Sequence, residues 1–191
     1  MVPRLRAAAF VAVLGLLGAA CGPPWEIVRR APGELILGRR SLGVAPVSFE
    51  GTSVEGVPAS EWLAARDAEA AERLEASEQR FAARFGAALR AAAAGHGIHV
   101  LVDPRVERPL VFPRVTELDP GSYDFDAARA SRVELAVLVV GPSGALEEVA
   151  LGHGSPARAV APGPDGRLND DATALGAAVA EYLRRRVAGE D

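Results

Sequence analysis

The sequence predicts an α/β (α+β) fold: a mixed, mostly antiparallel sheet with one β-α-β crossover and two helices, the first long, on one face. Three observations predict it. A long Ala/Glu/Arg/Leu-rich run lies between two extended segments. An alternating, then wholly apolar, segment is followed by a turn and a second extended segment. An amphipathic segment closes the chain. A composition of 49% hydrophobic and 24% charged residues is that of a folded domain.

The N-terminal segment has the layout of a signal peptide. Arg4 and Arg6 precede an apolar run over residues 7–20. That run is shorter than the ~20 residues that a membrane-spanning helix needs. Small residues at 18–20 then precede Cys21, the single cysteine of the chain. Residues 1–20 are therefore expected to be removed as a signal peptide.

Cys21 is the expected lipidation site. The segment before it resembles the bacterial lipobox, although Gly18 stands where the lipobox has Leu. Two or more acyl chains on Cys21 would give stable attachment to a membrane. The alternative is ordinary signal-peptidase cleavage, which Gly18 and Ala20 also permit, and a secreted soluble product. Gly22, by resemblance to enterobacterial lipoproteins, favours the periplasmic face of the outer membrane.

The mature chain is expected to be one domain. Residues 21–33 read as the lipidated cysteine with a Pro/Gly spacer, and residues 34–191 as a single α/β domain. Within it, residues 35–37 and 42–49 are predicted strands, with Pro46 suggesting an edge position or a bulge in the second.

A long helix is predicted over residues 61–94, capped by Ser60 and ended by Gly95 and Gly97. Its second half has one apolar face with three- and four-residue spacing. The residues of that face are Leu74, Phe81, Phe85, Ala88, Leu89 and Ala92. Apart from Trp62 and Leu63 its first half is highly charged, which is typical of a solvated helix or of one that packs against a partner.

Four further strands and a second helix follow. Residues 98–103 and 110–118 read as extended segments, and residues 131–140 as the central strand of the sheet. After a Gly-Pro-Ser-Gly turn, residues 145–152 should pair with that strand as a hairpin. Residues 155–168 read as a loop before a helix that is capped by Asn169 or Asp170 and runs to Val187.

The order of these elements resembles a small envelope domain found in TolB N-terminal domains and in curli-secretion-type lipoproteins. The corresponding pieces are "VAPVSF" at 44–49, "VTELDPG" at 115–121, the hairpin at 131–152 and the closing helix. The resemblance implies an envelope location and contacts with other proteins. It carries no catalytic residues to this chain.

Candidate catalytic or metal-binding residues are few. His96 and His99 stand in an H-x-x-H pattern, with Gly97 between them and no third histidine nearby in sequence. His153 stands next to a Gly-Ser-Pro that fails the G-x-S-x-G pattern of a nucleophile elbow around Ser155. These residues are expected not to converge, and we expect no cofactor and no metal.

The charge balance argues against nucleic acid as a partner, because the formal net charge is -4. The sequence thus predicts a lipid-anchored cell-envelope protein with a binding or assembly role, no catalysis and an unidentified envelope protein as its partner. The alternative is a periplasmic hydrolase or metal-dependent enzyme that uses His96, His99 and His153.

Overall fold

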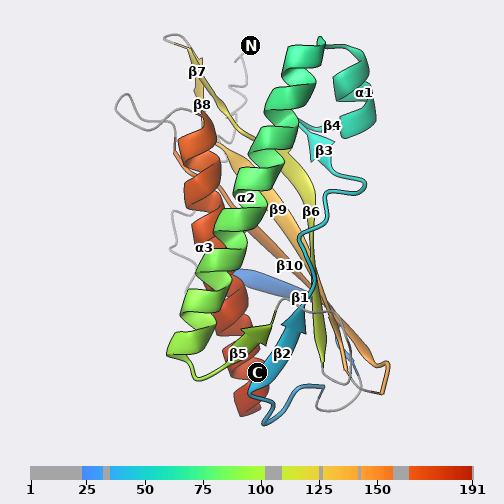
Figure 1. Cartoon of the computed structure of the whole chain (residues 1–191), viewed down its shortest axis with the longest axis vertical. Coiled ribbons are helices and arrows are strands. Elements are labelled where there is room, and N and C mark those ends of the chain that lie inside the picture. The colour runs from blue at the N-terminus through green and yellow to red at the C-terminus, as the bar shows by residue number, and fades with distance from the viewer. Residues whose placement is uncertain are drawn as a thin grey trace, which may run out of the picture.

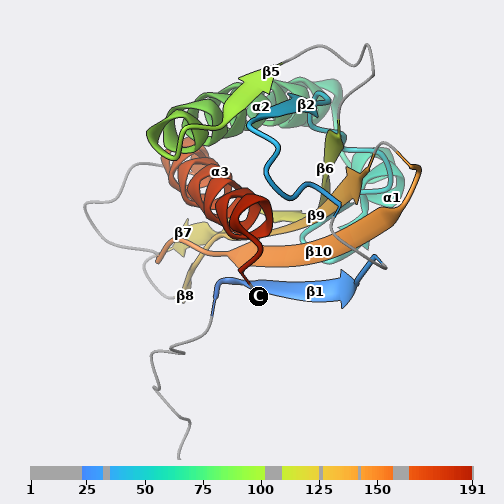
Figure 2. The same ribbon diagram turned by 90° about the horizontal axis from the view of Figure 1, so that it is seen from below.

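The computed structural model describes residues 23–31, 35–101, 109–124, 127–141, 143–156 and 164–190. The predicted signal peptide and Cys21 lie outside these residues. The predicted fold class is confirmed: an eight-stranded mixed sheet carries the two long helices on one of its faces (Figures 1 and 2). Within the described residues, no helix has the length and apolar character needed to cross a bilayer.

The main sheet contains β1 (Trp25–Arg29), β2 (Ser41–Val44), β3 (Ser53–Val54), β4 (Val57–Pro58), β5 (His99–Leu101), β6 (Leu110–Asp119), β9 (Arg132–Val140) and β10 (Leu146–His153). A separate ribbon is formed by β7 (Ser122–Asp124) and β8 (Ala127–Arg129). The helices are α1 (Ala59–Ala64), α2 (Ala68–Gly95) and α3 (Pro164–Ala188).

The strand order β1-β10-β9-β6-β2-β5 places β9 in the middle of the sheet, as predicted. It pairs antiparallel with both β10 and β6. Val137 and Val139 face the helices and are almost fully buried. Ala136 and Leu138 point to the opposite face and are only half-buried. Residues 136–140 are apolar on both faces, but the helices cover only one.

The β-α-β crossover is also confirmed. Strand β2 pairs parallel with β5, and α2 lies between them in the sequence. Strand β2 pairs parallel with β6 on its other side. The spacing of Phe81, Phe85 and Leu89 turns all three toward the core, where each is 1% exposed.

The spacer predicted over 21–33 is too long, because Trp25–Arg29 form the edge strand β1. This strand pairs antiparallel with β10. The Trp25 ring packs edge-on against Tyr182 of α3, with centroids 5.8 Å apart, and the Arg185 guanidinium lies over the same indole. The five residues of β1 show little alternation of apolar and polar side chains. The packing of Trp25 against α3 therefore helps to hold this segment in the sheet.

The first predicted strand is absent and the second is shorter than expected. Residues 35–37 form a turn rather than a strand, although Leu35 and Ile36 are buried in the core. The second strand ends at Val44. After a backbone hydrogen bond from Ala45 to Val111, the chain pairs with β6 again at the isolated bridge of Ser48 with Arg114. Pro46 lies in this gap, and its missing N–H is consistent with the interruption.

The predicted long helix is two helices. The chain leaves α1 at Ala65 and begins α2 after Asp67, whose Oδ1 accepts a hydrogen bond from the backbone N–H of Ala70 at 2.8 Å. An aspartate in this position is a preferred N-cap, so the second helix starts there rather than at Ser60. The last helix also starts earlier than predicted, at Pro164, a residue favoured in the first turn of a helix.

Helices α2 and α3 pack tightly against each other at Gly176. A Cβ atom on Gly176 would lie 2.7 Å from the carbonyl oxygen of Phe85 and 2.9 Å from the backbone nitrogen of Leu89. Only glycine fits this position without movement of the α2 backbone.

Candidate functional site

A hollow of about 430 Å³ lies where the beginning of α2 meets the β3–β4 hairpin, the end of β6 and the beginning of α3. We call it the arginine groove. Its apolar lining comes from Val54, Ala70, Leu74, Leu118 and Leu168. Its polar lining includes Trp62, Arg66, Arg73, Ser77 and Arg80. A volume in this range is typical of small-molecule sites.

The helical period places the arginines of α2. Arg73 and Arg80 are two turns apart, so they lie on the same side of α2, next to the inward-facing Leu74 and Ser77. Arg66 belongs to the connection between α1 and α2. The sequence shows this spacing of the arginines and the apolar Leu74 beside them. It gives no sign that side chains from β3, β6 and α3 complete the apolar lining.

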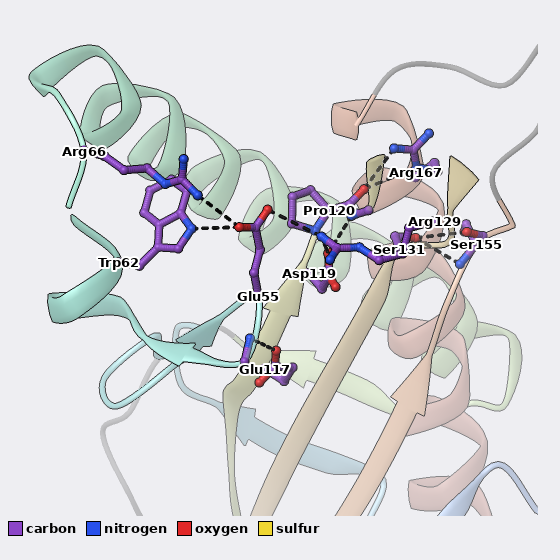
Figure 3. Close-up of polar contacts among 12 residues, drawn as sticks. Glu55, Trp62, Arg66, Glu117, Asp119, Pro120, Arg129, Ser131, Ser155 and Arg167 are labelled. Atoms are coloured by element: carbon purple, nitrogen blue, oxygen red, sulfur yellow. Dashed lines mark hydrogen bonds and ion pairs between the residues drawn. The ribbon is translucent and has the colours of Figure 1, made fainter. Parts of the chain in front are cut away.

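One edge of the groove is organised by Glu55 (Figure 3). Glu55 and Gly56 form the two-residue turn of the β3–β4 hairpin with φ of 54° and 79°. Positive φ at both positions is the requirement of a type I′ turn, and it is uncommon for glutamate. The Oε2 atom of Glu55 accepts hydrogen bonds from Trp62 Nε1 at 3.1 Å and from Arg66 at 3.2 Å.

These bonds fix the indole and the guanidinium together. The guanidinium carbon of Arg66 lies 4.3 Å from the centroid of the Trp62 ring, a cation–π contact. The backbone N–H of Gly56 donates to Glu117 Oε1 at 2.8 Å, which fastens the turn to β6. The Trp62–Arg66 pair is therefore held in place before any ligand binds.

Arg129 extends this network toward β8. Its guanidinium lies 3.0 Å from Asp119 Oδ1 and 3.5 Å from Glu55 Oε1 (Figure 3). Asp119 also accepts a hydrogen bond from the backbone N–H of Gly121 at 2.8 Å. Asp119 is thus bound by an arginine and a backbone amide, and Glu55 by two arginines and an indole N–H.

Arg167 is an unusual buried cation at the beginning of α3. It is 2% exposed, and its Nε and NH2 atoms donate to the carbonyl oxygen of Pro120 at 3.3 and 3.1 Å (Figure 3). Among the described residues it has no carboxylate within ion-pair distance. The groove wall at Pro120 and Leu168 therefore lies beside a positive charge.

The three histidines lie apart in the described structure. His96 Nε2 is 3.7 Å from Glu181 Oε2, and His153 Nδ1 is 2.8 Å from Asp171 Oδ1. Their two partners are about 15 Å apart along α3 at 1.5 Å per residue. His99 is exposed on β5. The described residues contain no group of three or more His, Cys, Asp or Glu side chains that could hold a metal.

His153 and Ser155 do meet, contrary to the expectation that none of these residues would converge. Asp171 Oδ1 accepts hydrogen bonds from Ser155 Oγ at 2.7 Å and from His153 Nδ1 at 2.8 Å. Asp171 Oδ2 accepts from Ser131 Oγ at 2.6 Å. The backbone N–H of Ser131 donates to the Ser155 carbonyl, so the end of β10 and the start of β9 are neighbours above this carboxylate.

The arrangement differs from a catalytic triad. A triad needs a serine bonded to histidine and that histidine bonded to a carboxylate. Here Ser155 and His153 each bond directly to the buried Asp171, and the described contacts include no bond between them. The cluster joins α3 to the sheet. Asp171 could have been suspected from its place next to the apolar stripe of Leu168, Ala172 and Leu175.

Comparisons with known proteins identify no family. No protein-family model and no curated protein matches the sequence. Among solved structures, the chain is similar to the PelC dodecamer from Paraburkholderia phytofirmans, with 11% identity, a TM-score of 0.44 and coverage of 78% of this chain and 96% of that chain. A variant of that dodecamer matches with 17% identity and a TM-score of 0.48, covering 81% and 96%.

Proposed function

We propose that this protein is a lipid-anchored component of the cell envelope and that its domain binds a partner rather than transforming a substrate. The observation that carries the anchor is the placement of Cys21 directly after a signal-peptide-like segment. Gly22 favours the periplasmic face of the outer membrane. An unidentified envelope protein remains the proposed partner, as the resemblance to TolB N-terminal and curli-secretion-type domains implies.

The short distance between anchor and domain gives this proposal a geometric consequence. Strand β1 begins at Trp25, and only Gly22, Pro23 and Pro24 separate it from Cys21. Four residue steps span at most about 14 Å. Acyl chains on Cys21 would therefore hold the β1 edge of the sheet close to the membrane surface, and two or more chains suffice for stable attachment.

The site geometry supports binding over catalysis. The arginine groove joins an apolar lining to fixed guanidinium groups, which is the chemistry of recognition. The serine and histidine that meet at Asp171 are arranged as hydrogen-bond donors to a buried carboxylate. Neither arrangement provides a serine activated by a histidine base.

The anchor is tested by Cys21→Ala in the native host, with membrane fractionation and mass spectrometry of the N-terminal peptide. The wild type should sit in the membrane fraction and carry acyl mass on a peptide beginning at Cys21. The variant should lose that mass and stay unprocessed or be cleaved elsewhere. An unmodified Cys21 on a soluble periplasmic protein would overturn the anchor and favour ordinary signal-peptidase cleavage.

Gly22→Asp is the matched variant for location. It retains Cys21 and should keep the acyl mass. In a host that follows the enterobacterial sorting rule, it should move the protein from the outer to the inner membrane on a density gradient. Retention in the outer membrane would contradict the role proposed for Gly22 and would leave lipidation itself unaffected.

A further inference from the structure

We propose that the arginine groove binds a single-chain anionic amphiphile, with its acyl chain along the apolar lining and its phosphate head group at the arginines. This gives a ligand class to the binding role proposed above, on which it rests. It is independent of the anchor at Cys21.

The lining of the groove fits an acyl chain. Val54, Leu74, Leu118 and Leu168 present aliphatic side chains from β3, α2, β6 and α3, and Ala70 leaves space between them. Val54, Ala70, Leu118 and Leu168 are all buried, so the lining belongs to the folded core and is formed in advance. Transfer of a hydrocarbon chain from water onto such a surface contributes about 25 cal/mol per Å² buried.

The rim fits an anionic head group. Arg73 and Arg80 are exposed on the same side of α2, and Arg66 is positioned against Trp62 at one end. Guanidinium groups bind phosphate oxygens through paired N–H donors. Among the described residues, the lining carries three arginines and no acidic side chain, although Arg66 and Arg73 each pair with a carboxylate outside it. An anionic head group therefore fits this rim better than a cationic one.

A phosphate would exchange with the existing partners of Arg73 and Arg80. Arg73 pairs with Glu69 of the same helix, and both side chains are more than half exposed. Exposed pairs of this kind contribute only about 0.3–0.5 kcal/mol, so exchange of partner costs little. Arg80 donates to Ser77 Oγ at 3.2 Å and makes a further interaction, so it too would exchange a partner. Arg66 stays on Glu55 and forms a fixed wall of the groove.

The size of the groove favours a small amphiphile over a polypeptide. A hollow of about 430 Å³ is within the ~300–1,000 Å³ of small-molecule pockets. A protein partner would require a larger surface, on the order of 800 Å² per side. Free phosphate would use only the rim and would make no contact with the aliphatic lining.

The test uses the full chain with Cys21→Ala and Trp25→Phe, so that lipidation is absent and Trp62 is the sole tryptophan. Dodecyl phosphate is titrated below its critical micelle concentration while Trp62 emission is recorded. Inorganic phosphate and dodecyltrimethylammonium are titrated in parallel. Saturable one-to-one binding is expected for dodecyl phosphate, with at least tenfold weaker binding for the other two probes.

The double variant Arg73→Gln/Arg80→Gln should weaken dodecyl phosphate binding at least tenfold. Both side chains are exposed, so the fold should persist, and circular dichroism checks it. Arg90→Gln is the matched control, because Arg90 is an exposed arginine of the same helix outside the groove. It should change the Kd less than twofold.

Three results would overturn the proposal. These are absence of saturable binding, equal binding of the anionic and cationic amphiphiles, or a Kd that the double variant leaves unchanged. Tighter binding of an acidic amphipathic peptide than of dodecyl phosphate would also overturn it, in favour of a protein ligand. Because every sample lacks Cys21, these outcomes are distinct from failure of the lipid anchor.

Discussion

At the scale of single residues, Asp171 is the clearest structural anchor. Its carboxylate is fully buried and accepts hydrogen bonds from Ser131, His153 and Ser155. Asp171→Ala leaves buried hydroxyl groups without their acceptor, and hydrogen bonds to a charged group contribute about 1.5–3 kcal/mol each. We expect a loss of about 2–4 kcal/mol in the free energy of unfolding, measured by urea denaturation.

The neighbouring Asp170 provides the control for this substitution. Asp170 is exposed on the same turn of α3, so Asp170→Ala should change the free energy of unfolding by no more than about 0.5 kcal/mol. Equal effects of the two substitutions would show that the cluster contributes nothing beyond a general helix effect.

At the scale of elements, the two faces of β9 should differ in their tolerance of charge. Val139 is 1% exposed beneath the helices, whereas Leu138 lies on the uncovered face and is half-buried. Val139→Asp buries a carboxylate without a partner and should destabilise the protein by more than about 3 kcal/mol. Leu138→Asp should cost clearly less, because water reaches that face.

Thermal and urea unfolding of both variants would measure this difference. If Val139→Asp were as stable as Leu138→Asp, the helices would not cover the face of β9 that carries Val139. The burial described for this face of the strand would then be wrong.

The C-terminal part of α3 should make stability depend on acid. Hydrogen bonds from Arg184 and Arg185 lower the pKa of Glu181 from its ordinary value of 4.5 to about 2. Because the folded-state pKa is the lower one, the folded state gains stability above pH 4.5 and loses it as the pH falls toward 2. The carboxylate is about one-third exposed, so the gain should be no more than about 1 kcal/mol.

Glu181→Gln should remove this part of the pH dependence, which urea unfolding between pH 2 and pH 5 would measure. The double variant Arg184→Gln/Arg185→Gln removes the donors and should flatten the profile in the same way. A Glu181→Gln profile that falls as steeply as that of the wild type would contradict the role given to these ion pairs.

At the scale of the whole molecule, the features that the sequence predicts correctly are those that depend on local residue patterns. Alternation of apolar residues identifies β9 and β10 as a hairpin, and a long helical run between extended segments identifies the crossover. The break before α2 is also local, since Asp67 is a good N-cap inside a run of strong helix formers. Ser60 offers a competing cap, and helix propensity does not decide between the two residues.

The remaining features depend on contacts between distant segments. Strand β1 is identified by the packing of Trp25 on Tyr182, which its own five residues do not reveal. The arginine groove needs Leu118 and Leu168 to lie beside Leu74, and only the folded sheet and helix pair bring them together. The meeting of His153 and Ser155 at Asp171 has the same origin, because α3 must first cross the ends of β9 and β10.

The pairing of Trp25 with Leu151 has a consequence for the order of folding. Strand β1, the first of the described fold, pairs with β10, which comes much later in the sequence. In a chain that emerges N-terminus first, residues 25–29 therefore stay unpaired until β10 has formed. Closure of such a long loop is entropically costly and slows folding. Until β1 docks, β10 exposes an unpaired backbone edge that another chain can join. The newly made protein is therefore most exposed to aggregation in the interval between formation of the β9–β10 hairpin and arrival of β1.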